Sequence, residues 1–286
     1  MKKYIKLMRV HHYIKNFLVF AALVCSGQLF NTEKLLAGGL GFLAFCLISS
    51  VVYVVNDIRD REKDKLHPTK CKRPIASGAV SVKQGWALAA VLFVLSWVLN
   101  FLAANRVATV LMALYFVLNL AYSFVLKDIP MVDVTILVAG FLIRILYGAF
   151  ITGITVSNWL YLTVIALAFY FALGKRRNEL KHMKDGQTRK VLEYYPISFL
   201  DKSMYMCLTL AIAFYSLWSM DERTIALYGN EYLVFTVPIV MLIVMKYSLA
   251  VEGESDGDPV EVLVHDKVLL GLVVLYLAAM FCILYL

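Results

Sequence analysis

Nine long apolar segments dominate the sequence, and each is about as long as a helix that crosses a bilayer. The segments cover residues 14–31, 36–55, 84–103, 107–125, 131–152, 158–174, 200–219, 231–250 and 267–286. A membrane-spanning helix needs roughly 20 mostly apolar residues, and these runs lack the alternation of polar and apolar residues typical of barrel strands. Only 17% of the 286 residues are charged, below the roughly 25% of soluble domains. We therefore expect an all-α polytopic membrane protein, with nine transmembrane helices in a single integral membrane domain over residues 1–286.

The positively charged residues lie mainly in alternate connections between these segments. Lys and Arg total 28 against 20 for Asp and Glu, which gives a net charge of +8. Eight cations lie between the second and third segments, and eight run from Lys175 to Lys202, between the sixth segment and the start of the seventh. Loops rich in Lys and Arg face the cytoplasm, so we expect a multi-pass protein of the inner (plasma) membrane with a cytoplasmic N-terminus and an external C-terminus. The two basic loops, about residues 56–83 and 175–199, then face the cytoplasm.

The first basic loop also carries three regularly spaced carboxylates. Asp57, Asp60 and Asp64 are spaced i, i+3 and i+7, which puts them on one face of a helix. Carboxylates on one face repel one another unless a cation lies among them, and Mg²⁺ typically binds one or two carboxylates together with phosphate oxygens. Cations that can hold an anion follow at Lys65, Lys70, Lys72 and Arg73. We interpret the loop as a site for a metal-bound pyrophosphate; the alternative is a solvated loop with helical salt bridges.

The run from Asn56 to Asp64 (Asn-Asp-x-x-Asp-x-x-x-Asp), followed by Lys-Arg-Pro-Ile at residues 72–75, resembles the first signature of the UbiA intramembrane prenyltransferase superfamily. This resemblance implies a bundle of nine helices around a central cavity that is open to lipid. It also implies that the two cytoplasmic loops cap the cavity and carry the acidic motifs. The aspartates at 57, 60 and 64 are then the catalytic residues, and they hold Mg²⁺ through a diphosphate.

The second basic loop departs from the pattern of the aromatic prenyltransferases in that superfamily. Those enzymes carry Lys-Asp-x-x-Asp-x-x-x-Asp here, whereas this chain keeps Lys175, has Arg176 in place of the first acid and has Glu179 at the second. Met183 stands at the third position. An acid cluster holds a second metal, but arginine binds phosphate directly through planar, forked donors. The loop therefore favours substrates that bring additional phosphate; the alternative is a set of cations that anchors the helix end at the membrane face.

The Lys-Arg-Arg-x-Glu-Leu run at residues 175–180 resembles the decaprenyl-phosphate phosphoribosyltransferase branch of the superfamily. So do residues 12–20 and the run Asn-Leu-Ala-Tyr-Ser at 119–123, together with Lys127 and Asp133. That branch transfers the 5-phosphoribosyl group from 5-phosphoribosyl 1-pyrophosphate (PRPP) to a polyprenyl phosphate. The resemblance implies this activity at the cytoplasmic membrane face, with Mg²⁺ as cofactor and with polyprenyl phosphate, PRPP and membrane lipids as partners. The excess of cations then reflects membrane orientation and anionic substrates rather than nucleic-acid binding, and homo-oligomerisation stays open.

Further polar residues are candidates for substrate binding. The complete set is Lys15, Asn56, Lys70, Arg73, Tyr122, Lys127, Arg144, Lys175, Arg176, Glu179 and Arg189. Arg144 stands apart because it lies within an apolar segment, where a charge is costly and normally faces a cavity or a partner. Asp133 lies 11 residues earlier, about three helical turns, so the two share a face. The sequence leaves open whether Arg144 touches a phosphate or forms a structural pair between helices.

Two other functions are compatible with parts of this pattern. The first is a UbiA-type prenyl diphosphate:aromatic acceptor prenyltransferase, which shares the aspartate motif; Arg176 in place of an acid argues against it. The second is a transporter or lipid flippase, which nine spans alone would permit. Transporters place polar sites at the midplane on broken helices, whereas the acids here lie in predicted cytoplasmic loops.

Overall fold

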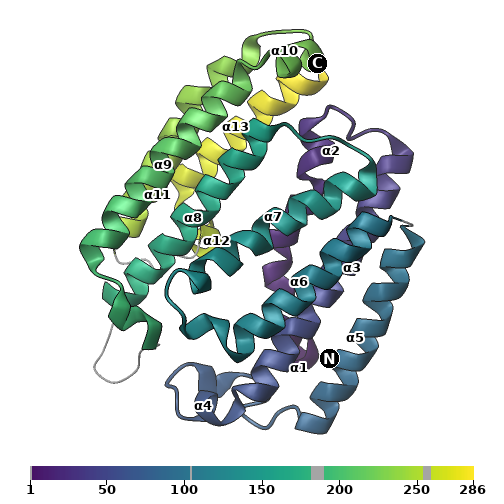
Figure 1. Cartoon of the computed structure of the whole chain (residues 1–286), viewed down its shortest axis with the longest axis vertical. Helices are drawn as coiled ribbons and strands as arrows, with labels where there is room; N and C mark the ends of the chain where they lie inside the picture. The colour runs from purple at the N-terminus through teal and green to yellow at the C-terminus, as the bar shows by residue number, and fades with distance from the viewer. Residues whose placement is uncertain (1, 104, 182–189, 254–258) are drawn as a thin grey trace. The chain divides into compact units, whose positions relative to one another are not determined.

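The computed structural model describes residues 2–103, 105–181, 190–253 and 259–286, and within these ranges it contains helices and turns but no strands (Figure 1). The helices in chain order are α1 (Lys2–Met8), η1 (Val10–Phe20), α2 (Ala21–Cys25), α3 (Thr32–Arg59), α4 (Arg61–Lys65), η2 (Lys70–Lys72), α5 (Val82–Leu102), α6 (Arg106–Phe124), η3 (Leu126–Asp128), α7 (Val132–Thr152), α8 (Asn158–Lys181), η4 (Lys190–Tyr194), α9 (Ile197–Ser219), α10 (Glu222–Tyr228), η5 (Tyr232–Thr236), α11 (Val237–Glu252), α12 (Pro259–His265) and α13 (Lys267–Tyr285).

Eight helical segments in the described ranges are long and apolar enough to cross a membrane. They are α3, α5, α6, α7, α8, α9, the continuous segment formed by η5 and α11, and α13. Hydrocarbon offers no hydrogen-bond partners, so a helix that pairs its own N–H and C=O groups is the expected form for each run. The prediction of an all-α polytopic membrane protein is confirmed.

The first of the nine predicted spans differs from the prediction. Val10–Phe20 winds as a 3-10 helix, α2 continues it to Cys25, and Gly27 then turns the chain with a φ of 70°. Glycine suits this position because a side chain disfavours positive φ. The apolar helix therefore covers Val10–Cys25 rather than residues 14–31, and it is shorter than the other spans.

The chain divides into two compact units. Unit 1 comprises Met1–Val24, Gln28–Lys127 and Ile143–Thr155. Unit 2 comprises Cys25–Gly27, Asp128–Leu142 and Val156–Leu286. The first half of α7 thus belongs to unit 2 and the second half to unit 1.

In unit 1, α3 is the central helix and packs against η1, α5 and α6. The fully buried side chains of Phe45, Met112 and Tyr147 lie in its core. The second half of α7 approaches η1 very closely, because a Cβ atom at Gly148 would lie 1.8 Å from the carbonyl oxygen of Val19. This helix contact therefore requires glycine.

Arg144 lies in the same apolar core, and its guanidinium has polar partners on two neighbouring helices. Its Nε donates to Asn16 Oδ1 over 2.7 Å, and its Nη2 donates to Tyr115 Oη over 3.0 Å. The guanidinium carbon also lies 5.2 Å from the centre of the Phe45 ring, a cation–π contact. Arg144 thus links α7 to η1 and α6, which favours the structural role among the two that the sequence leaves open.

In unit 2, α8 packs along α9, and α11 packs against α9 and α13. The buried side chains of Tyr170, Leu173 and Leu200 lie in its core. The hydroxyl groups of Tyr170 and Ser248 are 2.6 Å apart and link α8 to α11. The C-terminal end of α8 carries the second basic motif, so this packing fixes the position of that motif within unit 2.

Candidate active site

The three predicted metal-binding aspartates lie where α3 ends and α4 begins. α3 ends at Arg59, Asp60 departs from helical geometry with a φ of −85° and a ψ of 7°, and α4 begins at Arg61. Backbone hydrogen bonds from Asp60 N to Asn56 O (2.9 Å) and from Asp64 N to Asp60 O (2.8 Å) carry the helical register across this joint. The predicted helical spacing therefore holds approximately, although the helix is interrupted at the middle aspartate.

Two of the carboxylates share one arginine. Arg73 Nη1 lies 2.7 Å from Asp64 Oδ2 and 3.3 Å from Asp57 Oδ1. A second guanidinium reaches Asp57 from the N-terminal region, since Arg9 Nη2 donates to Asp57 Oδ1 over 2.7 Å. Asp57 is only 2% exposed, and a buried charge is stable only when it is paired. The loop thus holds a compact cluster of carboxylates and guanidinium groups.

Lys127 pairs with the middle aspartate. Its Nζ lies 3.4 Å from Asp60 Oδ2, and both side chains stay partly accessible. Lys127 lies in η3, directly after α6, so the end of α6 is brought to the aspartate loop. Every aspartate of the predicted metal site therefore has a cation beside it within unit 1.

The candidate residues of unit 1 are of two kinds: those that form ion pairs in the aspartate cluster, and those that lie elsewhere in the unit. Ion pairs join Arg73 to Asp57 and Asp64, and a separate ion pair joins Lys127 to Asp60. Asn56 precedes Asp57 on α3, Lys70 begins η2 in the same loop, and Tyr122 lies on α6 five residues before Lys127. Lys15 is half-buried in η1, and Arg144 lies in the helix core. The cluster is therefore built by the loop and by the end of α6.

The second basic motif contains a buried arginine that an acid on α7 holds in place. Arg176 is 1% exposed, and its Nε donates to Asp133 Oδ2 over 2.7 Å. Its Nη1 donates to Glu179 Oε2 over 2.9 Å. Tyr195 Oη donates to the other oxygen of Asp133, Oδ1, over 2.6 Å and accepts the backbone N–H of Met131. Both carboxylate oxygens of the fully buried Asp133 thus have a donor, as buried polar groups require.

The hydroxyl of Tyr195 is a fixed donor. Burial, and then the hydrogen bond and negative charge of Asp133, raise the pKa of Tyr195 to about 12. The phenol is therefore protonated at neutral pH. It keeps the Asp133 carboxylate oriented toward Arg176.

The other cations of the second motif differ in burial and in partners. Lys175 is half-buried, and Arg177 donates to Asp201 through Nε and to Glu252 through Nη2 (2.7 Å for the latter). Arg177 thus links α8, α9 and α11. Arg189 lies outside the described residues.

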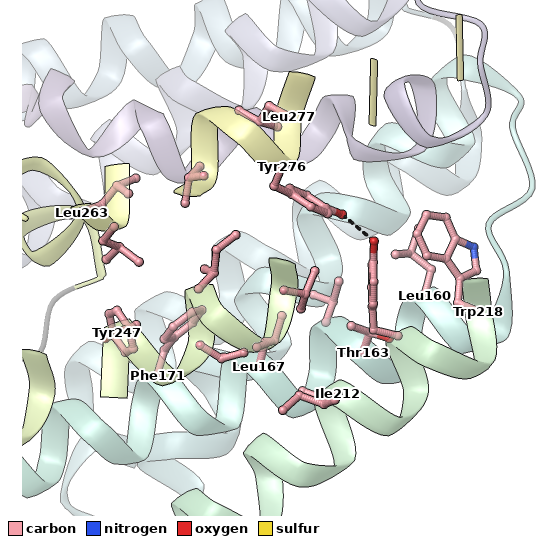
Figure 2. Close-up of a pocket in the computed structure, with 18 of the residues that line it drawn as sticks. Leu160, Thr163, Leu167, Phe171, Ile212, Trp218, Tyr247, Leu263, Tyr276 and Leu277 are labelled. Carbon is pink, nitrogen blue, oxygen red and sulfur yellow. Dashed lines mark hydrogen bonds between the residues drawn. The ribbon is translucent and has the colours of Figure 1, made fainter. Parts of the chain in front are cut away.

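An apolar pocket of about 430 Å³ lies within unit 2 (Figure 2). Side chains from α8, α9, α11 and α13 form most of its wall, and its size is in the range of roughly 300–1,000 Å³ that ligand pockets show. Tyr215 Oη donates to Tyr276 Oη over 3.2 Å on the side where Leu160 and Trp218 lie (Figure 2). The pocket therefore has an almost wholly apolar lining with a pair of hydroxyl groups near one side.

One face of α8 connects this pocket to the basic motif. Leu160, Leu167 and Phe171 line the pocket, and Lys175 follows Phe171 after four residues. Residues four apart lie on the same helix face, one turn further along. A chain that lies along this face of α8 therefore approaches Lys175 at its polar end.

Two contacts of the site have little signal in the sequence. Arg9 lies 48 residues before its partner Asp57 and is one of several cations ahead of the first apolar segment, where positive charge is expected on topological grounds alone. Tyr195 lies 62 residues after Asp133. Pairing at such distances depends on helix rotation, which spacing along one helix does not specify.

The helices and the paired acids and bases, many of them at or near the ends of the apolar spans, are typical of an integral membrane enzyme. The model of the UbiA prenyltransferase family matches residues 17–265. The chain therefore belongs to the UbiA prenyltransferase family and is a transferase of that family.

The relatives share most of their length with this chain. The decaprenyl-phosphate phosphoribosyltransferase of Corynebacterium glutamicum is 37% identical over 98% of this chain and 85% of that protein. The protein of the same name from Mycolicibacterium smegmatis is 34% identical over 93% of this chain and 87% of that protein. For Mycobacterium tuberculosis the identity is 31%, over 96% of this chain and 91% of that protein. The resemblance to this branch is confirmed.

Solved structures show the same fold. A UbiA homologue from Archaeoglobus fulgidus bound to GPP and Mg²⁺ has a TM-score of 0.74 at 19% identity, with 99% of both chains covered. The apo structure of a UbiA homologue from Aeropyrum pernix has a TM-score of 0.63 at 17% identity, with 93% of this chain and 98% of that chain covered. The prediction of a UbiA-like helical bundle is confirmed.

Proposed function

We propose that this chain transfers the 5-phosphoribosyl group of PRPP to a polyprenyl phosphate, with Mg²⁺, at the cytoplasmic membrane face. The observation that carries the proposal is the second motif, where Arg176 replaces an acid that would hold a second metal. Arg176 has a fixed partner in Asp133, and its Nη1 points to Glu179, whose side chain is 25% exposed. A phosphate that replaces Glu179 would meet a forked donor.

The relatives support the same activity. The three decaprenyl-phosphate phosphoribosyltransferases cover between 93% and 98% of this chain. The name of these relatives describes the transfer of a phosphoribosyl group to a polyprenyl phosphate. Those two substrates carry more phosphate than a prenyl diphosphate and an aromatic acid, which agrees with an arginine in the second motif.

The aspartate cluster of unit 1 is the proposed site for the diphosphate of PRPP. Arg73 Nη1 lies against Asp57 and Asp64 together, so these two carboxylates can share one cation, and carboxylate oxygens are ligands that Mg²⁺ prefers. Among the described residues, no group of three His, Cys, Asp or Glu side chains could hold a metal. We propose that Asp57, Asp60 and Asp64 would hold Mg²⁺ only together with phosphate oxygens of the donor, which supply the ligands that these three side chains do not provide by themselves. When bound, Mg²⁺ neutralises the departing pyrophosphate.

The proposed binding residues of each unit act mainly by positioning and by charge. Arg73 and Lys127 neutralise the donor phosphates, and Lys175 and Arg176 bind the remaining phosphates. The bond between ribose C1 and the pyrophosphate oxygen breaks, and a bond forms between C1 and a phosphate oxygen of the polyprenyl phosphate. That oxygen is already anionic, so no side chain has to remove a proton. Orientation and electrostatic stabilisation then supply most of the rate enhancement.

The apolar pocket of unit 2 is the proposed site for the first part of the polyprenyl chain. Its lining is almost entirely apolar, and the α8 face that carries Phe171 continues to Lys175. A lipid with its chain in this pocket would bring its phosphate toward the basic motif.

We also propose that the protein resides in the inner membrane with its N-terminus in the cytoplasm and its C-terminus outside. This orientation needs Val10–Cys25 to cross the bilayer despite its short length. A 3-10 helix rises about 2.0 Å per residue against 1.5 Å for an α-helix, so 11 plus five residues span roughly 30 Å, the thickness of the hydrocarbon core. Cys71 reports the side of the first basic loop: with the other four cysteines replaced, an impermeant maleimide should label it in inside-out vesicles and not in right-side-out vesicles.

The activity is tested with purified protein in detergent and Mg²⁺. One reaction contains PRPP labelled in the ribose together with polyprenyl phosphate, and the other contains labelled prenyl diphosphate with 4-hydroxybenzoate. We expect a lipid-soluble ribosyl product in the first reaction. Prenylated 4-hydroxybenzoate in the second reaction, with no product in the first, would show the aromatic prenyltransferase instead.

A further inference from the structure

The residue that reaches Asp57 from the N-terminus has unusual geometry. Arg9 separates α1 from η1 in a left-handed conformation, with a φ of 53° and a ψ of 49°. Residues other than glycine adopt this conformation at a cost, and such strain concentrates at functional sites. Its guanidinium lies 4.8 Å from the centre of the Tyr53 ring and 2.7 Å from Asp57 Oδ1. Backbone and side chain together therefore aim Arg9 at the aspartate cluster.

The helix before Arg9 is attached to the loop that carries Arg73. Lys3 Nζ donates to the carbonyl oxygen of Ala79 over 3.0 Å, and Lys6 Nζ donates to that of Lys72 over 3.3 Å. These contacts join the N-terminal residues to the loop across more than 60 positions of sequence. The N-terminal helix and the loop are therefore joined to each other, and each contributes one arginine, Arg9 or Arg73, to the carboxylate of Asp57.

The charges on Asp57 restrict how a metal can reach it. Arg9 Nη2 and Arg73 Nη1 both contact Oδ1 of this buried side chain. A cation that binds the same oxygen has to displace at least one guanidinium, because like charges repel and the side chain is 2% exposed. Arg9 and Arg73 are partly exposed, at 19% and 26%, so a displaced guanidinium can turn toward a new anion at the mouth of the site.

We propose that Arg9 binds the donor diphosphate, and that it exchanges its partner Asp57 for a diphosphate oxygen when the donor binds. Arg9 leaves Asp57 when a Mg²⁺–diphosphate binds, and it then donates to a diphosphate oxygen. The exchange would keep the charges balanced, because Asp57 would then pair with Mg²⁺ and Arg9 would pair with the diphosphate. The planar guanidinium suits both partners, since carboxylate and phosphate accept the same forked pair of donors. This inference rests on the proposed diphosphate site but does not depend on which group the donor transfers.

The exchange predicts effects of opposite sign on two ligands. In Arg9→Met, Mn²⁺ alone should bind the protein more tightly, by roughly three- to tenfold, because one competing charge is gone. Inorganic pyrophosphate in the presence of Mg²⁺ should bind more weakly, by a similar factor. Mn²⁺ binding is measured by electron paramagnetic resonance and pyrophosphate binding by calorimetry, both in detergent. Lys2→Met removes one charge from an exposed position of α1 that is not among the contacts joining α1 to the loop, so it should leave both affinities unchanged.

Arg9→Lys completes the test, because it keeps the charge and loses the fork. It should bind Mn²⁺ like the wild type and bind pyrophosphate more weakly, and it serves alone if Arg9→Met does not fold. Weaker or unchanged Mn²⁺ binding in Arg9→Met, or unchanged pyrophosphate binding in Arg9→Lys, overturns the inference and leaves Arg9 a structural residue. Pyrophosphate is common to PRPP and prenyl diphosphates, so these results stand even when the assay with PRPP fails.

Discussion

Tyr195 Oη lies 2.6 Å from Asp133 Oδ1 and ties the segment before α9 to the first turn of α7. Arg176 occupies the other oxygen of the same carboxylate. Asp133 is therefore the common partner of a phenol and a guanidinium from different parts of unit 2. The orientation of the second basic motif depends on this buried acid, which the sequence assigns to an apolar segment.

The first prediction concerns the stability of unit 2 at high pH. The raised pKa of Tyr195, about 12, means that the folded protein holds the phenolic proton more tightly than the unfolded chain, whose tyrosines titrate near 10. The stabilisation is complete below pH 10 and is lost as the pH rises toward 12. Thermal unfolding in detergent should therefore show a loss of stability between pH 10 and 12 that is smaller in Tyr195→Phe.

Tyr195→Phe should also be less stable at neutral pH, by about 1–3 kcal/mol, because one buried oxygen of Asp133 loses its donor. Tyr194→Phe is a matched control, since Tyr194 is exposed. Equal loss of stability between pH 10 and 12 in the wild type and in Tyr195→Phe would show that Tyr195 is not the responsible group.

The second prediction tests the buried ion pair. Asp133→Asn and Arg176→Gln should each destabilise the protein by about 3–5 kcal/mol, because each leaves a buried charge without its partner. The double variant should cost clearly less than the two single variants together, since residues in contact are coupled. Chemical unfolding of the four proteins measures the coupling. Additive losses would mean that the contact between Arg176 and Asp133 contributes little.

The sequence predicts most of the helices, but it does not predict the buried contacts between them. A hydrocarbon environment forces each apolar run of the required length into a helix, so α3 and α13 follow from length and composition alone. The winding of Val10–Phe20 as a 3-10 helix and the close approach of its Val19 to Gly148 of α7 do not follow from length and composition.

The candidate site shows the same division. Asp57 and Asp64 share Arg73, and their helical spacing in the sequence already groups them. Asp133 and Arg144 lie on one α-helix 11 residues apart, yet the described contacts give each a different partner, Arg176 for Asp133 and Asn16 for Arg144. Those partners come from other helices, and their choice depends on how the helices are rotated and packed.

The third prediction concerns the aspartate cluster. Asp60→Asn should lower the turnover at saturating Mg²⁺ by about 100-fold or more, which is typical for the loss of a group that stabilises developing charge. Glu62→Gln is the matched control, because Glu62 lies in the same loop, is 72% exposed and pairs with Lys65. It should retain nearly full activity. Asp60→Asn with wild-type turnover would remove Asp60 from the catalytic residues.

The fourth prediction concerns the apolar pocket. Ala211 lines the pocket from α9, and Ala213 lies on the exposed side of the same helix. Ala211→Phe fills part of the space, so it should raise the KM for a long-chain polyprenyl phosphate by about tenfold, the effect of losing a few well-packed methylene groups. The KM for PRPP should not change. Ala213→Phe adds the same ring on the outer face and should leave both constants unchanged. The assay compares a long-chain acceptor with a short-chain analogue. An equal effect of Ala211→Phe on both acceptors would show that the pocket does not hold the chain.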